Sequence, residues 1–128
     1  MVERPFAAPT NPYGPGHRGV DLLFPAGDPV HVAASGRVTF AGSVAGRGIV
    51  VVAHSDGIRT EYEPVTPVVR RGETVTRGDT LGALTGRHPG CPVVNCLHWG
   101  ARRGQTYLDP LTLLQPLGAV RLLPWPTR

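Results

Sequence analysis

Two short segments, far apart in the chain, carry the residues best suited to chemistry. The first is His17-Arg18-Gly19-Val20-Asp21 and the second is Cys96-Leu97-His98. Two imidazoles and one carboxylate form a ligand set that binds a divalent metal and leaves one coordination position open for water. The two segments therefore indicate a metal site that joins the beginning and the end of the chain.

Backbone geometry limits how these side chains can meet. In a strand, residues i and i+2 face the same side about 7 Å apart, so Cys96 and His98 are predicted to face one site. His17 and Asp21 would stand about 13 Å apart on a straight strand. The glycines and the proline around His17 disfavour a helix, which would otherwise bring the two together. We therefore expect the chain to bend at Gly19.

At these residues the sequence resembles a known family. His-x-x-x-Asp, followed much later by Leu-His ahead of a strand, is similar to the pattern of the LytM/lysostaphin-type zinc peptidases, which cut peptidoglycan cross-bridges. Other matching motifs follow in order: Gly27-Asp28-Pro29-Val30, Ala34-Ser35-Gly36-Arg37-Val38, Gly46-Arg47-Gly48, His54-Ser55-Asp56-Gly57, Gly72-Glu73-Thr74-Val75 and Tyr107-Leu108-Asp109-Pro110. The resemblance implies that zinc is the cofactor and that His17, Asp21 and His98 are its ligands.

The sequence departs from the family pattern at two positions that handle protons. The family's closing motif is His-x-His, whose first histidine assists catalysis, and Cys96 stands at that position here. The family also carries Tyr-x-His on a middle strand, where this chain has Tyr62-Glu63-Pro64. Pro64 therefore replaces the histidine, or Glu63 does if a deletion shifts the register. The metal ligands are retained, whereas the proton-handling histidines are not.

Several other side chains are candidates for the site. Glu63 would act as general base if the strand register carries it to the groove, and Tyr62 or His54 would donate a hydrogen bond to the oxyanion. We expect Arg102 and His88 to line the substrate groove.

Losing a positioned base or an oxyanion donor costs about a hundredfold in rate or more. The expected function is thus a zinc endopeptidase of reduced activity on peptidoglycan cross-link peptides. The alternative is a non-catalytic domain that keeps the zinc site and binds peptidoglycan or regulates a separate hydrolase.

The two cysteines leave three interpretations open. Cys91 and Cys96 are the only cysteines in the chain. A disulfide between them would brace the loop beside His98 in an oxidising compartment. Two free thiols are the second interpretation. In the third, the Cys96 thiolate is a fourth zinc ligand on the face of His98, which would close the site and make it structural.

Composition and patterning predict one all-β domain. The 128 residues include 17 glycines and 14 prolines, which suit short strands joined by turns. Strands are predicted at 30–33, 36–41, 48–54, 58–63, 80–84 and 97–102 and at Val75, and the apolar run 49–53 predicts a strand buried on both faces. Asp109 and Pro110 would begin one short C-terminal helix. With the resemblance, this predicts an antiparallel domain over residues 5–115, made of a twisted sheet with a second small sheet, and a tail at 116–128.

Charge and hydropathy narrow the partners and the compartment. A net charge of +4 favours anionic surroundings such as cell-wall polymers. No arginine run with interleaved aromatic residues is present, so nucleic acid is not expected as a partner. No apolar run is long enough to cross a membrane. The N-terminus does not have the pattern of a secretion signal, so a secreted or wall-associated protein would carry its signal or anchor outside this chain. We expect a monomer.

Overall fold

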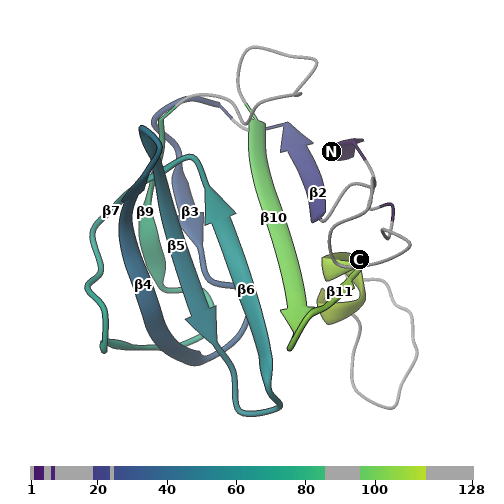
Figure 1. Ribbon diagram of the computed structural model, residues 1–128. Helices are drawn as coiled ribbons and strands as arrows, with labels where there is room; N and C mark the ends of the chain where they lie inside the picture. The colour runs from purple at the N-terminus through teal and green to yellow at the C-terminus, as the bar shows by residue number, and fades with distance from the viewer. Residues whose placement is uncertain (1, 5–6, 8–18, 24, 86–95, 115–128) are drawn as a thin grey trace.

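The computed structural model describes residues 2–4, 7, 19–23, 25–85 and 96–114, which form two antiparallel sheets (Figure 1). The strands of the large sheet are β1 (Val2–Arg4), β2 (Gly19–Leu23), β4 (Gly36–Val44), β5 (Arg47–Ala53), β6 (Ile58–Glu63), β8 (Thr74–Val75), β10 (Cys96–Arg103) and β11 (Thr106–Leu108). They follow the order β1-β2-β10-β6-β5-β4-β8, and β11 pairs with β10. The small sheet has the order β3-β9-β7, with bounds Pro29–His31, Thr80–Leu84 and Val65–Pro67.

The core lies between the two sheets, because each strand of the large sheet turns one set of alternate side chains toward the small sheet. Figure 1 shows β3, β7 and β9 behind β4, β5 and β6. The buried cluster draws on both sheets: Val20, Val30, Val32, Val38, Val50, Val52, Tyr62, Val65, Val69, Val75, Leu81, Leu84, Leu97 and Trp99. The opposite face of the large sheet carries no second layer among the described strands.

The apolar strand β5 corrects one prediction from the sequence. Val50 and Val52 are buried, but Ile49, Val51 and Ala53 are only partly buried. The run is therefore buried on one face and not on both. Hydropathy alone cannot distinguish the two cases, since the partly exposed side chains are as apolar as the buried ones.

Close contact between the two sheets depends on one glycine in β5. A Cβ atom at Gly48 would overlap the backbone carbonyl oxygen of Val65 in β7. The absence of a side chain at Gly48 therefore lets β7 pack directly against β5. The close approach fixes where the chain leaves the end of β6, which carries one of the candidate catalytic residues.

The prediction of an all-β domain with a second small sheet is confirmed. The predicted C-terminal helix is a 3-10 helix, η1 (Pro110–Leu114). The short strands β1, β2, β7 and β11 are additional to those predicted, because strands this short depend on a pairing partner. The domain limits at 5 and 115 stay a prediction.

Candidate functional site

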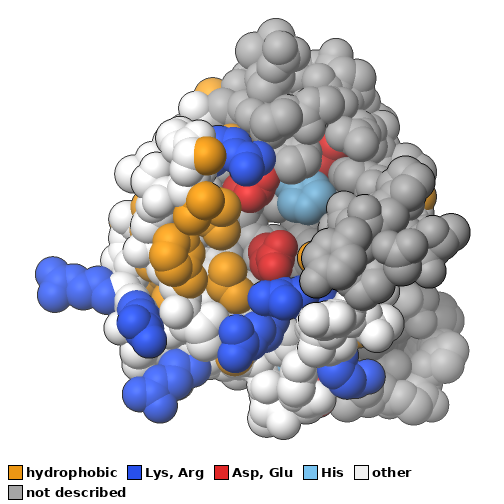
Figure 2. Space-filling view, in the orientation of Figure 1, with side chains coloured by type: hydrophobic (Ala, Val, Ile, Leu, Met, Phe, Trp, Pro, Cys, Tyr) orange, Lys and Arg blue, Asp and Glu red, His pale blue; other side chains and the backbone are white. Residues whose placement is uncertain are grey.

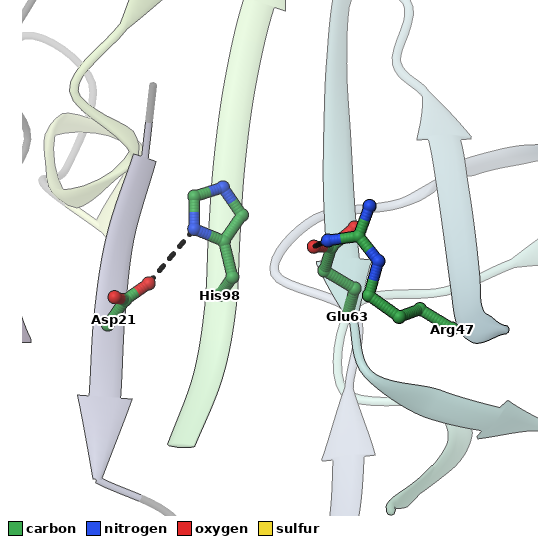
Figure 3. A network of polar contacts seen from close by, with 4 residues as sticks. All are labelled: Asp21, Arg47, Glu63 and His98. Atoms are coloured by element: carbon green, nitrogen blue, oxygen red, sulfur yellow. Dashed lines mark hydrogen bonds and ion pairs between the residues drawn. The ribbon is translucent and has the colours of Figure 1, made fainter. Parts of the chain in front are cut away.

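Three neighbouring strands bring the candidate site residues into one row. Strand β10 lies between β2 and β6, and His98 is one of three β10 residues, with Trp99 and Gly100, that are paired on both sides. Its partner in β2 is Asp21 and its partner in β6 is Glu63. Directly opposed residues point to the same face of a sheet. Asp21, His98 and Glu63 therefore share one face, which is the face opposite the core (Figure 3).

Asp21 and His98 form a buried polar contact. Their Oδ1 and Nδ1 atoms lie 2.9 Å apart, and the residues are 0% and 7% exposed, respectively. When Nδ1 carries the proton, it donates to the carboxylate. Burying a carboxylate and an imidazole costs folding free energy unless the two groups are paired or bind a metal. This contact confirms that residues 77 positions apart in the sequence meet at one point.

The ring of His98 fits against the start of β2 because that strand begins with a glycine. A Cβ atom at Gly19 would lie 2.8 Å from both Nε2 and Cε1 of His98, which is closer than real side chains approach. Gly19 thus leaves the space that the imidazole occupies. The predicted bend at this residue stays a prediction, since residues 8–18 lie outside the described part of the chain.

The geometry of Asp21 and His98 fits two neighbouring positions in a zinc site. With zinc–ligand bonds of about 2.0–2.1 Å, two ligand atoms of a tetrahedral ion lie about 3.3 Å apart. The observed separation of 2.9 Å would need to widen by only a few tenths of an ångström. His17, the third predicted ligand, lies outside the described residues. Among the residues described, no group of three or more His, Cys, Asp or Glu side chains forms a metal site.

Glu63 lies on the other side of His98 and is held by an arginine. Arg47 Nη1, from the start of β5, is 3.0 Å from Glu63 Oε2. The Glu63 side chain is mostly buried, whereas the Arg47 side chain is about one-third exposed. Figure 3 shows Glu63 and Arg47 meeting beside β10, on the side of His98 away from Asp21. A carboxylate is thereby fixed one strand away from the candidate metal ligand.

Tyr62 and His54 belong to a different network, on the core face of the sheet. The Tyr62 hydroxyl lies 2.9 Å from Thr60 Oγ1 and accepts a hydrogen bond from the Ala33 amide at 3.1 Å. His54 Nε2 is 2.8 Å from Thr60 Oγ1, and its Nδ1 is 2.8 Å from the carbonyl oxygen of Ser35. Burial raises the pKa of Tyr62 above its ordinary value. The sheet separates this network from the row of Asp21 and His98, so Glu63 alone of the three candidates lies beside it.

The structure describes only some of the other predicted site residues. Arg102 shares the face of His98, four positions along β10, and its Nε lies 3.3 Å from Glu61 Oε2. Cys96 has the same parity on β10 and is fully buried. His88 and Cys91 lie outside the described residues, so neither their places nor the cysteine pairing is tested.

Sequence reasoning missed the role of Arg47. The motif Gly46-Arg47-Gly48 was part of the family resemblance, and alternation along β5 puts Arg47 on the face of Ile49 and Val51. Its contact with Glu63 depends on the register between β5 and β6, which local sequence does not give. A basic residue at the end of an apolar strand was the only signal.

Comparison with known proteins identifies the family. Residues 15–110 match the model of peptidase family M23. The chain belongs to this family. The match covers Asp21, His98 and the strands that hold them, and it agrees with the LytM/lysostaphin-type pattern of the motifs.

Relatives with sequence and structural similarity support the assignment. An uncharacterized protein of Mycobacterium tuberculosis is 48% identical in an alignment of 127 positions, and the match covers 96% of this chain and 51% of that protein. The DD-carboxypeptidase/endopeptidase Mpg of Neisseria meningitidis is 31% identical in an alignment of 103 positions, and the match covers 78% of this chain and 23% of Mpg. The catalytic domain of lysostaphin from Staphylococcus simulans shares the fold, with a TM-score of 0.66 at 24% identity over 88% of this chain and 87% of that domain. This M23 chain spans about half of its mycobacterial relative and about a quarter of Mpg.

Replacing Tyr62 by Phe tests the separation of the two faces. We expect Tyr62→Phe to lower the free energy of unfolding by about 1–2 kcal/mol, because the Ala33 amide loses its hydrogen-bond acceptor and Thr60 loses one of its two contacts. Since burial raises the pKa of Tyr62, its stabilising contribution is complete below pH of about 10 and is lost as the pH rises above that value. Urea unfolding at a pH well below and at a pH above about 10 measures both effects. Zinc content should not change. A variant that kept wild-type stability but lost zinc would show that Tyr62 belongs to the metal site and would contradict the separation of the two faces.

Proposed function

We propose that this M23 chain is a zinc-dependent peptidase domain that acts on the peptides of peptidoglycan. His17, Asp21 and His98 would hold the zinc. The observation that carries the proposal is the buried contact of 2.9 Å between Asp21 and His98, with Glu63 in the same row. Such an arrangement supplies two ligands and a nearby carboxylate on a face of the sheet that the core does not use.

Zinc in a site with three protein ligands lowers the pKa of a water molecule and polarises a carbonyl group. The residues of the chain have complementary tasks. Asp21 and His98 are held in place by the two ladders of β10, so the ligand atoms are positioned before any metal arrives. Glu63 would accept the proton of the attacking water at its carboxylate, because it is the described acidic side chain opposite His98. Arg47 would keep that carboxylate oriented through its Nη1 contact.

A second function, of a different class, is supported by the two departures from the family pattern. Cys96 and Pro64 stand where the family has histidines, and Pro64 is buried directly after the end of β6. A chain that binds zinc and peptidoglycan without cutting would serve as a binding or regulatory domain. We favour the peptidase because Asp21 and His98 are retained with ligand geometry and because Glu63 supplies a carboxylate beside them.

The proposal also covers the cellular compartment and the state of the two cysteines. Peptidoglycan lies outside the cytoplasm, so an extracytoplasmic location follows, secreted or associated with the wall. In an oxidising compartment we infer that Cys91 and Cys96 are joined by a disulfide, which would brace the segment that leads into His98. In the described residues, no helix is long and apolar enough to cross a membrane. The monomeric state stays a prediction.

Incubation with purified peptidoglycan tests the proposal directly. We expect the zinc-loaded protein to release soluble peptide fragments, and a chelator to stop the release. Added zinc should restore it. His98→Ala should lose most of the bound zinc and the activity together, because the metal site would lose one of its ligands. Fragments are separated by chromatography, and zinc is measured by elemental analysis.

The outcomes separate the two functions. Binding to peptidoglycan without fragment release, at full zinc occupancy, would support the non-catalytic domain and contradict the peptidase. Release of fragments that a chelator does not affect would contradict the role of zinc. Wild-type zinc content in His98→Ala would contradict the ligand assignment.

The role of Glu63 has its own test, with a matched control in the same strand. Glu61 also lies on β6, faces the same side and pairs with an arginine, Arg102. Glu63→Gln should lower kcat by about a hundredfold or more, because the amide cannot accept a proton. Glu61→Gln should change kcat by less than about threefold. Zinc content should be unchanged in both variants.

Equal loss in the two variants would show that the face needs negative charge in general and not a base at Glu63. Unchanged activity in Glu63→Gln would remove Glu63 from the reaction. Steady-state kinetics on a soluble wall peptide provides the comparison.

A further inference from the structure

Three arginines lie in one line across the open face of the large sheet. Arg37 in β4 is paired with Ala53 in β5, and Ala53 is paired with Arg59 in β6. Arg59 is paired in turn with Arg102 in β10. Directly opposed residues point to the same face of a sheet, so all three arginines share the face of His98. We call Arg37, Arg59 and Arg102 the arginine row.

The positive charges of the row are only partly compensated. Arg37 and Arg59 are exposed, and neither forms an ion pair within the described part of the chain. Arg102 is half-buried, and its Nε lies 3.3 Å from Glu61 Oε2. Like charges that lie directly opposite each other on two strands destabilise a sheet. The pairing of Arg59 with Arg102 therefore favours an anion bound between them.

Two further acidic side chains, in the turns beside the row, accept hydrogen bonds from the backbone. Asp56 Oδ1 accepts from the Ile58 amide at 3.0 Å, and Glu73 Oε1 accepts from the Arg70 amide at 3.1 Å. Both carboxylates thus stabilise turns, and the surface at the row keeps a positive charge. Figure 2 shows basic side chains gathered on this face, beyond the acidic side chains and the histidine.

The spacing of the row suits a ligand that carries several charges. Neighbouring strands lie about 4.8 Å apart, so Arg59 and Arg102 can bind one anionic group between them. Arg37 lies two strands from Arg59, about 10 Å away along the row. Guanidinium groups bind phosphate through two parallel hydrogen bonds. A chain of phosphate groups therefore complements the row in both charge and spacing.

The row runs parallel to the candidate metal site and at a distance from it. Arg102 follows His98 by four residues on β10, which corresponds to about 13 Å. Glu61 lies between the two on β6, and Glu63 lies beside His98. These carboxylates repel an anionic chain from the metal site. A polyanion bound to the arginine row thus leaves the metal site accessible.

We propose that the arginine row binds an anionic wall polymer whose units are joined by phosphodiester groups. Each phosphodiester carries one negative charge that can pair with the guanidinium groups of the row. Binding holds the domain at the wall while the metal site acts on a neighbouring peptide. The choice of a wall polymer over other phosphodiester chains rests on the proposed function, which places the domain outside the cytoplasm.

Binding to a soluble polymer of glycerol phosphate tests the inference. The zinc-loaded protein should bind it, and added salt should weaken binding because exposed charges are screened. The double variant Arg37→Gln with Arg59→Gln should bind at least about tenfold more weakly, since contacts to charged groups are lost. Arg59→Gln alone should show part of this loss. Binding is measured by isothermal titration calorimetry.

The matched control is the double variant Arg70→Gln with Arg71→Gln. Both residues are exposed and lie between β7 and β8, outside the row. This variant loses the same net charge as the first one, but it should bind the polymer within about threefold of the wild type. Urea unfolding and zinc content should match the wild type in every variant, which shows that a change in binding does not come from unfolding.

Several results would overturn the inference. The wild type would not bind the polymer at low salt, or the two double variants would lose equal affinity, so that net charge and not the row explains binding. Equal affinity for polyglutamate would show that the row does not select phosphate. Tighter binding of single-stranded DNA than of the glycerol phosphate polymer would contradict the choice of a wall polymer.

The proposed function fails or holds independently of the row. Peptidoglycan freed of phosphodiester polymers should release the same amount of peptide with the wild type and with Arg37→Gln, Arg59→Gln. Polymer binding that depends on the row, without any fragment release, would support the row and contradict the peptidase. Chelator-sensitive release by a wild type that does not bind the polymer would support the peptidase and overturn the row.

Discussion

The pairing of β10 with both β2 and β6 determines the site. Each ladder fixes one neighbour of His98: Asp21 on one side and Glu63 on the other. A shift of one residue in either register would turn the partner to the opposite face of the sheet. The two ladders thus bring together residues from the beginning, middle and end of the described chain. No local sequence pattern could place these residues side by side. The small side chain of Gly19 then leaves space for the imidazole.

The two faces of the large sheet have different roles: one packs into the core, and the other carries the candidate site. One face packs on the small sheet and includes Tyr62, whose hydroxyl contacts Thr60 and the Ala33 amide. The other face carries the charged pairs Arg47–Glu63 and Arg102–Glu61. Partly exposed ion pairs of this kind add little to stability, so their value lies in fixing where the carboxylates are. The core can therefore stabilise the fold without using the polar side chains that the site needs.

The sequence allowed the fold class and most of the strands to be predicted, because alternation and motif order are local signals. The contact of Asp21 with His98 agrees with the predicted ligand set, which itself stays a prediction. The sequence did not decide between Glu63 and Tyr62, which are adjacent in the chain and differ only in the face they occupy. Pairing between β6 and β10 decides this, and pairing is a long-range property. His54 was a candidate because of its residue type, but its ring is bound by Thr60 and Ser35 on the core side. The exposure of Ile49 and Val51 was missed for the same reason: an apolar run does not reveal that only one face is covered.

X-ray absorption at the zinc edge of the zinc-loaded protein tests the metal site most directly, because it reports the atoms around the ion. Ligation by His17, Asp21 and His98 predicts nitrogen and oxygen neighbours at about 2.0–2.2 Å, with the outer-shell scattering of imidazole rings, and no sulfur. A sulfur neighbour at about 2.3 Å would show that Cys96 binds the ion and closes the site. That result would contradict an open zinc site between β2 and β10 and the peptidase function that depends on it.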